Sequence, residues 1–154
     1  MRRMLFVLAV LLSMDAFADT PAEMFMGGYD DVKGAKHIEV KGGTMVFARP
    51  VIRKFPIGPM ADLVEEVSVL NMSKTGSSEK DTFLAKLKVM LEMNYKYYGK
   101  SDTPNGIVDV YVHLASDDLA DELVIYNPEL FVLNSLVGKF PVEQLLKLGA
   151  ENGR

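Results

Sequence analysis

The sequence contains no cysteine, and this absence excludes several classes of protein. Without cysteine there is no disulfide bond, no thiolate ligand for a metal and no cysteine nucleophile. A lipid anchor of the bacterial lipoprotein type is excluded too, because it requires a cysteine directly after the cleavage site. Stability therefore depends on the hydrophobic core, and 49% of the 154 residues are hydrophobic.

Familiar catalytic motifs are also absent, and histidine is scarce. The sequence has no G-x-S-x-G, G-x-G-x-x-G, phosphate-binding-loop or H-E-x-x-H pattern. Its only histidines are His37 and His113. We therefore expect no catalytic residue, no cofactor-binding residue, no metal ligand and no cofactor.

The first eighteen residues have the pattern of a secretory signal peptide. Arg2 and Arg3 form a positive start, the segment 4–14 is almost entirely apolar, and Ala16 and Ala18 form a small-x-small cleavage signal. The apolar segment is far shorter than the ~20 residues of a membrane span, which argues against an uncleaved anchor. We expect cleavage after Ala18 and export in soluble form to the periplasm or the extracellular space.

Cleavage would remove 18 of the 154 residues and a net charge of +1, which leaves 136 residues with a net charge of −5 instead of −4. This length suits one domain. The acidic charge argues against nucleic acid or an anionic membrane surface as the partner. We expect a signal peptide at 1–18, a flexible N-terminal lead-in at 19–36, a single α+β domain at 37–150 and a tail at 151–154.

The hydrophobic pattern of the first half predicts two strands and two helices. Alternating polar and apolar residues indicate strands at 37–40 and 66–72. A helix is predicted over 45–55, but proline lacks an amide donor, so the helix either starts close to Pro50 or is kinked by it. The most regular stripe predicts a helix over 79–98 that ends at Gly99. Its apolar members are Phe83, Leu84, Leu87, Met90, Leu91, Tyr95 and Tyr98.

The second half predicts three successive strands, at 107–114, 122–126 and 130–137, which suit an antiparallel meander. Residues 138–141 then open a last helix, which Gly149 closes. The expected order is β-α-β-α-β-β-β-α. This order predicts the α+β class, with a mostly antiparallel sheet and helices packed on one face.

Several segments resemble the family known as domain of unknown function 4252, which occurs in exported bacterial proteins of the Bacteroidetes type. They are VSVLNM, FLAKLKVMLEMNYKYYG, IVDVYVHL, ELVIY and LNSLVGKFPVEQLLKL, within residues 37–149. The resemblance implies an α+β fold and an address in the bacterial envelope, and it implies no catalytic residues. Many members carry a cysteine after the signal peptide, which this sequence lacks.

The histidines are the first candidates for chemistry. His113 would share a strand face with Asp109 and Tyr111, and His37 with Glu39, because alternate residues of a strand point the same way. Two or three ligands along one face fall short of a closed metal site, which needs four converging ligands. We therefore expect ordinary strand faces at both positions.

The acidic and tyrosine clusters are the remaining candidates. Calcium prefers loop oxygen ligands, but the spacing differs from an EF-hand, so a solvated hairpin tip is expected. The acidic group consists of Asp117, Asp118, Asp121 and Glu122. Glu65 and Glu66 are adjacent and would point to opposite faces of a strand, so they cannot act as a pair. Helix packing is expected for Tyr95 and Tyr98, and Tyr97 is expected to point elsewhere and be exposed. A tyrosine used for recognition is the alternative to packing.

These observations favour a non-enzymatic binding or adaptor module of the envelope whose partner is another envelope protein. The partner's identity is left open. A carrier of a small apolar ligand, held between the sheet and the helices, and a small enzyme with an unrecognised site are the alternatives.

Overall fold

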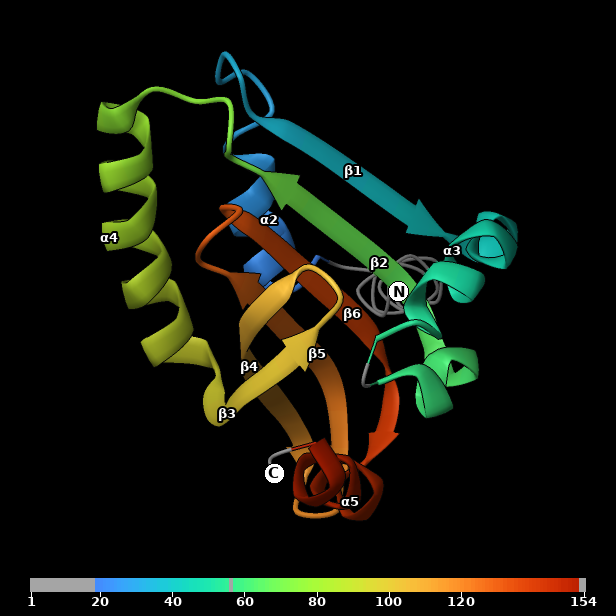
Figure 1. The fold of residues 1–154 in the computed structure, drawn as a ribbon. Helices are drawn as coiled ribbons and strands as arrows, with labels where there is room; N and C mark the ends of the chain where they lie inside the picture. Colours follow the sequence, from blue (N-terminus) through green and yellow to red (C-terminus); the bar gives the residue numbers. More distant parts are fainter. Residues whose placement is uncertain (1–18, 56, 153–154) are drawn as a thin grey trace, which may run out of the picture.

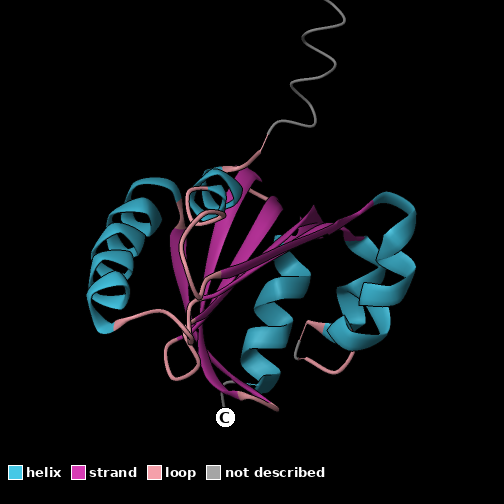
Figure 2. Cartoon of the chain, turned by 90° about the horizontal axis from the view of Figure 1, so that it is seen from above, coloured by secondary structure: helices cyan, strands magenta, loops and turns pink. Residues whose placement is uncertain are grey.

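The computed structural model describes residues 19–55 and 57–152. These residues form one antiparallel sheet of six strands with helices on both of its faces (Figures 1 and 2). The predicted signal peptide, residues 1–18, lies outside the described residues, and so do residues 153–154 of the predicted tail.

The six strands are ordered β1-β2-β6-β5-β4-β3 across the sheet, and every neighbouring pair is antiparallel. The strands are β1 (Lys36–Lys41), β2 (Val64–Asn71), β3 (Lys96–Thr103), β4 (Gly106–Ser116), β5 (Leu119–Asn127) and β6 (Val132–Pro141). Consecutive strands from β3 to β6 are neighbours, which confirms the predicted meander and extends it by one strand. Shifts of register interrupt four of the five pairings, and such bulges bend and twist a sheet.

The helices divide between the two faces. Helices α2 (Pro21–Gly27) and α4 (Ser77–Asn94) cover one face. The other face carries α3 (Met45–Ile52), α5 (Val142–Asn152) and the 3₁₀ segment η2 (Gly58–Leu63), which follows α3; a short 3₁₀ segment η1 (Gly42–Thr44) precedes α3. No helix among the described residues is both long and apolar enough to cross a bilayer.

The α+β class is confirmed, whereas the placement of all helices on one face is wrong. Strand β5 shows why, because it buries side chains on both sides. Val124 and Tyr126 belong to the core beneath α2 and α4, and Leu123 belongs to the core beneath α3 and α5. A strand covered on both faces loses the clean polar–apolar alternation that the prediction assumed.

The lead-in expected at 19–36 is also wrong, because part of it forms helix α2 and belongs to the core. Thr20 caps this helix through a reciprocal capping box with Glu23. Ala22 and Met26 are fully buried. The sequence signal was weak because the helix is only seven residues long and begins at a proline.

Helix α4 confirms the stripe of Phe83, Leu87 and Leu91, all of which are buried. It ends at Asn94 rather than Tyr98, because the chain continues directly into β3. Gly99, expected as a helix stop, sits instead at a register shift of β3 with φ of 110°, a conformation that favours glycine.

The last helix also begins and ends later than predicted. Residues 138–141 belong to β6, and α5 extends to Asn152 into the predicted tail. Gly138 is required for close packing rather than for starting a helix, because a Cβ there would lie 2.2 Å from the Leu63 carbonyl oxygen.

Candidate functional site

An apolar groove of about 440 Å³ lies on the face of the sheet that carries α3 and α5. All six strands contribute to its lining, from Val40 on β1 to Ser101 on β3. The groove exists because the two helices cover only parts of this face: α3 packs near β1 and β2, and α5 packs near β6 and β3. The middle of the sheet is therefore left open.

One row of side chains forms the floor. Val69 is paired with Asn134, Asn134 with Ile125, and Ile125 with Val110 in the sheet register, so the four lie side by side across β2, β6, β5 and β4. All four are half-buried. Three of them are branched aliphatic residues, so the floor offers water an apolar surface with one amide at its centre.

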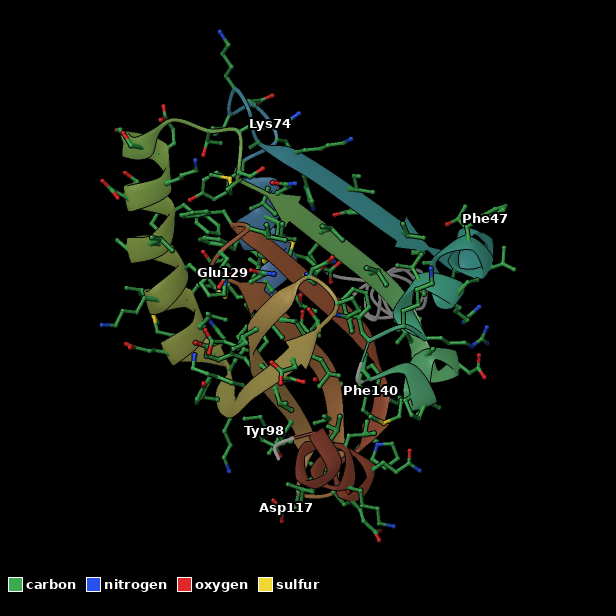
Figure 3. All side chains as sticks on the ribbon, viewed as in Figure 1. Phe47, Lys74, Tyr98, Asp117, Glu129 and Phe140 are labelled. Carbon is green, nitrogen blue, oxygen red and sulfur yellow. The ribbon has the colours of Figure 1, made fainter. Side chains whose placement is uncertain are left out.

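The walls come from the flanking helices and from β3. Ala48 and Ile52 line one side from α3, and Leu145 and Leu148 line the other from α5. Tyr98 contributes an aromatic ring from the bulged start of β3 (Figure 3). The sequence prediction placed Tyr98 on the buried side of a helix, whereas it is part of the wall of this groove.

The polar groups of the groove are few and mostly occupied. Asn127 donates to the Asn105 carbonyl at 3.0 Å and accepts from the backbone of 129 and 130. Lys100 is paired with Asp109 at 2.8 Å. The side chains of Asn134, Asn105 and Ser101 have no hydrogen-bond partner within the part of the chain that the structure describes. They leave two amides, of which Asn134 lies on the floor, and one hydroxyl available, with no unpaired charge beside them.

The opposite face of the sheet buries charge instead. Glu122 is 2% exposed and accepts hydrogen bonds from the hydroxyls of Thr20 at 2.6 Å, Ser135 at 2.5 Å and Tyr95. Burial raises the pKa of the Glu122 carboxyl, although the three hydroxyl donors oppose this shift. Burial also raises the pKa of the Tyr95 phenol, and the neighbouring Glu122 charge adds to that rise.

A second pair of carboxyl groups lies beside this network. A hydrogen bond shared with Glu23, followed by burial and by the Glu23 charge, raises the pKa of Glu66 to about 8. Glu23 also accepts from Ser68 at 3.4 Å and from the Thr20 amide at 3.2 Å. The sequence correctly excluded Glu65 as a partner of Glu66, but it missed Glu23, which approaches from the unpredicted helix α2.

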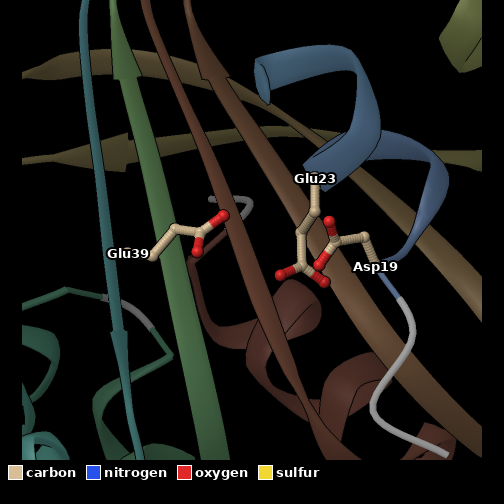
Figure 4. Close-up of side chains that lie close together, drawn as sticks. All are labelled: Asp19, Glu23 and Glu39. Atoms are coloured by element: carbon tan, nitrogen blue, oxygen red, sulfur yellow. The ribbon is translucent and has the colours of Figure 1, made fainter. Parts of the chain in front are cut away.

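Figure 4 shows that Asp19 and Glu39 approach the same place, with carboxylate oxygens of Asp19, Glu23 and Glu39 all within 4.8 Å of one another. Oxygens at this spacing could hold a cation. However, Glu23 is already used by the helix cap and by Ser68. The arrangement is thus explained as the anchoring of α2 to the sheet.

The two histidines lie in separate places. His37 Nδ1 is 2.6 Å from Asp30 Oδ1, and His113 Nδ1 is 2.6 Å from Asp121 Oδ1. Asp109 does not join His113, because it accepts hydrogen bonds from Lys100 and Tyr97. Each histidine therefore has an acidic neighbour that supports the ring.

The predicted acidic hairpin tip is only partly correct. Asp117 and Asp118 are exposed at the turn between β4 and β5, where Ser116 donates to Asp118 at 2.7 Å. Glu122 is the error, since it is buried in the network described above. Its burial depends on Thr20 and Tyr95, two residues far away in sequence, so no local pattern could have indicated it. Tyr97 is exposed, as the sequence predicts.

The face of the sheet that carries the groove and the face that carries the carboxyl groups therefore differ in kind. The first offers an open, uncharged surface to a ligand, and the second is closed by α2 and α4. Comparisons of this chain with protein families, with curated proteins and with solved structures found no match.

Proposed function

We propose that this protein is an exported, non-enzymatic binding protein that carries a small, largely apolar molecule with one neutral polar group. The observation that carries the proposal is the groove of about 440 Å³, apolar on its floor and walls and open to solvent. Sites for small molecules typically measure ~300–1,000 Å³ and combine apolar walls with a few polar groups.

The floor of the groove supports this choice over a simple packing face. Val69, Ile125 and Val110 are only half-buried, although they lie on the inner strands β2, β5 and β4 of the sheet. Leaving apolar area in water is unfavourable by roughly 25 cal/mol per Å², and a bound apolar molecule removes that cost. Asn134 and Ser101 would orient the single polar group of such a ligand.

The neutral lining also indicates that the polar group of the ligand is uncharged. The one cation in the lining, Lys100, is paired with Asp109, so no free positive charge faces the groove from the described residues. An anionic head would therefore be left without a partner. A hydroxyl, ester or amide group fits the Asn134 amide better.

Export is part of the proposal and depends on the sequence. The segment 4–14 and the small residues Ala16 and Ala18 form the predicted signal peptide. The resemblance to the domain of unknown function 4252 family stays a prediction, and it agrees with export to the bacterial envelope. A carrier outside the cytoplasm would need no cofactor and no catalytic group.

The proposal is tested by titrating the protein with the neutral fluorophore phenylnaphthylamine, whose emission rises in apolar surroundings. Val110→Phe places a larger side chain on the floor of the groove and should abolish the saturable signal. Val89→Phe is the matched control, because it makes the same change at an exposed position of α4 and should leave binding unaltered.

Two results would count against the carrier. Either the wild-type protein shows no saturable signal with phenylnaphthylamine or with long-chain alcohols as competitors, or Val110→Phe and Val89→Phe bind equally well. Either result would favour the adaptor function over the carrier function.

A further inference from the structure

We infer that helix α3 docks the protein on an anionic lipid surface, from which the groove takes up or delivers its ligand. This inference rests on the proposed function, because α3 forms one wall of the groove. An apolar ligand is sparingly soluble in water, so a carrier benefits from a direct contact with the membrane.

The first observation is the exposure of large apolar side chains on α3. Phe47 is 79% exposed, Val46 60% and Val51 55%. Phe47 extends away from the body of the protein at the outer side of α3 (Figure 3). Phe47 and Val51 are four residues apart and therefore share one side of the helix. Val51 also lines the groove, so this side of α3 leads directly to the groove's rim.

The second observation is the charge around these residues. Lys41, Arg49, Arg53 and Lys54 lie within the segment 40–61, which contains no acidic residue at all. The chain as a whole carries a net charge of −4, so the segment is a basic region in an acidic protein. Apolar side chains flanked by basic ones are typical of helices that lie at the surface of anionic membranes.

The basic residues differ in how free their charge is: Lys41 lies opposite Glu66 in the sheet register, whereas Lys54 is exposed and has no ion pair among the described residues. Arg53 pairs with Asp62 at 2.8 Å, but both side chains are more than half exposed, so the pair is weak. Arg49 donates to the Val64 carbonyl, which anchors α3 to the sheet without neutralising the charge. Lys54 is exposed in the turn that directly follows α3, so a cation lies close to the end of this helix.

Helix α4 shows that exposed apolar residues alone would not suffice. Met93 is 78% exposed and Val89 55%. However, α4 carries Glu79, Asp81 and Glu92 together with Lys80, Lys86 and Lys88, so its charges balance. Among the described helices, α3 alone combines exposed apolar side chains with a basic residue and no acidic one. Although the whole chain has a net negative charge, the segment around α3 is basic and would be attracted to an anionic surface.

The test is sedimentation of the mature protein with vesicles of phosphatidylcholine alone or mixed with phosphatidylglycerol. We expect binding to the mixed vesicles only, and a decrease in binding when salt screens the charges. Phe47→Ser should weaken binding roughly tenfold, since it removes the exposed aromatic ring that would enter the lipid surface. Lys54→Gln should weaken it roughly fivefold, the value for one basic residue near an anionic surface. Met93→Ser and Lys88→Gln are the matched controls on α4 and should bind like the wild type.

The outcomes separate this inference from the proposed function. Phenylnaphthylamine binding in solution should be the same for Phe47→Ser and for the wild type, since Phe47 is not in the groove. A protein that binds the fluorophore but not the mixed vesicles overturns the docking inference and leaves the carrier intact. Equal loss of vesicle binding in Phe47→Ser and Met93→Ser would also overturn it.

Discussion

The two faces of the sheet differ in which side chains they bury: one buries carboxyl groups, and the other leaves apolar side chains partly exposed. The face under α2 and α4 is closed, yet it contains the carboxyl groups of Glu23 and Glu122, both 2% exposed. The face under α3 and α5 is apolar, yet its central row at Val69, Ile125 and Val110 is only half-buried. Covering elements, rather than the strand residues themselves, therefore decide what is buried. The closed face supports the fold, and the open face is free to bind.

The largest expected effect comes from removing a side chain of the closed face. Leu87 on α4 is buried against the sheet, so Leu87→Ala should lower the free energy of unfolding by ~2–5 kcal/mol. Leu84→Ala is the matched control on the exposed side of the same helix and should cost less than about 1 kcal/mol. Denaturant unfolding measures both. Equal costs would show that α4 does not close this face.

A change of a polar residue to leucine should affect the two faces differently. Glu122→Leu leaves the hydroxyls of Thr20, Tyr95 and Ser135 without their acceptor and should cost ~1–3 kcal/mol. Asn134→Leu, on the open face, breaks no hydrogen bond among the described residues and should change stability by less than about 0.5 kcal/mol. Thermal melts of both variants measure the difference. A greater loss for Asn134→Leu would contradict the assignment of the two faces.

The closed face should also make stability depend on pH. The pKa of Glu66 is about 8 in the folded protein, above its ordinary value of 4.5, so the folded state binds its proton more tightly. The stabilisation is complete below pH 4.5 and is lost as the pH rises through about 8. Glu23 and Glu39 raise this pKa and Lys41 lowers it, so these are the groups that face the carboxyl.

Glu66→Gln removes this titration and should flatten the fall in melting temperature over that pH range, measured in the presence of a chelator. Glu65→Gln is the matched control, since Glu65 is its exposed neighbour. A pH profile that Glu66→Gln leaves unchanged would show that Glu23 and Glu66 do not share a proton.

Much of this comparison could be predicted from the sequence, but only the part that depends on local pattern. The stripe of Phe83, Leu87 and Leu91 indicated a helix against a sheet, and the alternation in 107–114 indicated a strand. Helix α2 was missed because seven residues carry too little periodicity. Without this helix the sequence could not indicate Glu23 as the partner of Glu66, or Thr20 as one of the three hydroxyl donors to Glu122.

The groove could not be predicted for a different physical reason. Val69, Asn134 and Val110 are distant in sequence and meet only through the order β2-β6-β5-β4. An apolar strand residue also has the same pattern whether a helix covers it or leaves it open. The register and the short lengths of α3 and α5 make the difference, and neither is visible in a hydrophobic pattern.

The smallest expected effect concerns the polar group in the groove. Asn134→Ala should weaken the binding of a long-chain alcohol about fivefold, the value of one ordinary hydrogen bond. The alkane of the same length, which has no polar group, should bind the variant and the wild type alike. Competition against phenylnaphthylamine measures both ligands, and equal weakening of the two would assign the Asn134 effect to packing.

The most direct test of the open face is a map of backbone amide shifts while phenylnaphthylamine is added to the protein. The account predicts that the largest changes fall on the central row at Val69, Val110, Ile125 and Asn134. The amides of Phe83, Leu87 and Leu91 on α4 should stay unchanged. Saturable changes on α4 with none on the central row would place the ligand on the closed face and contradict the account.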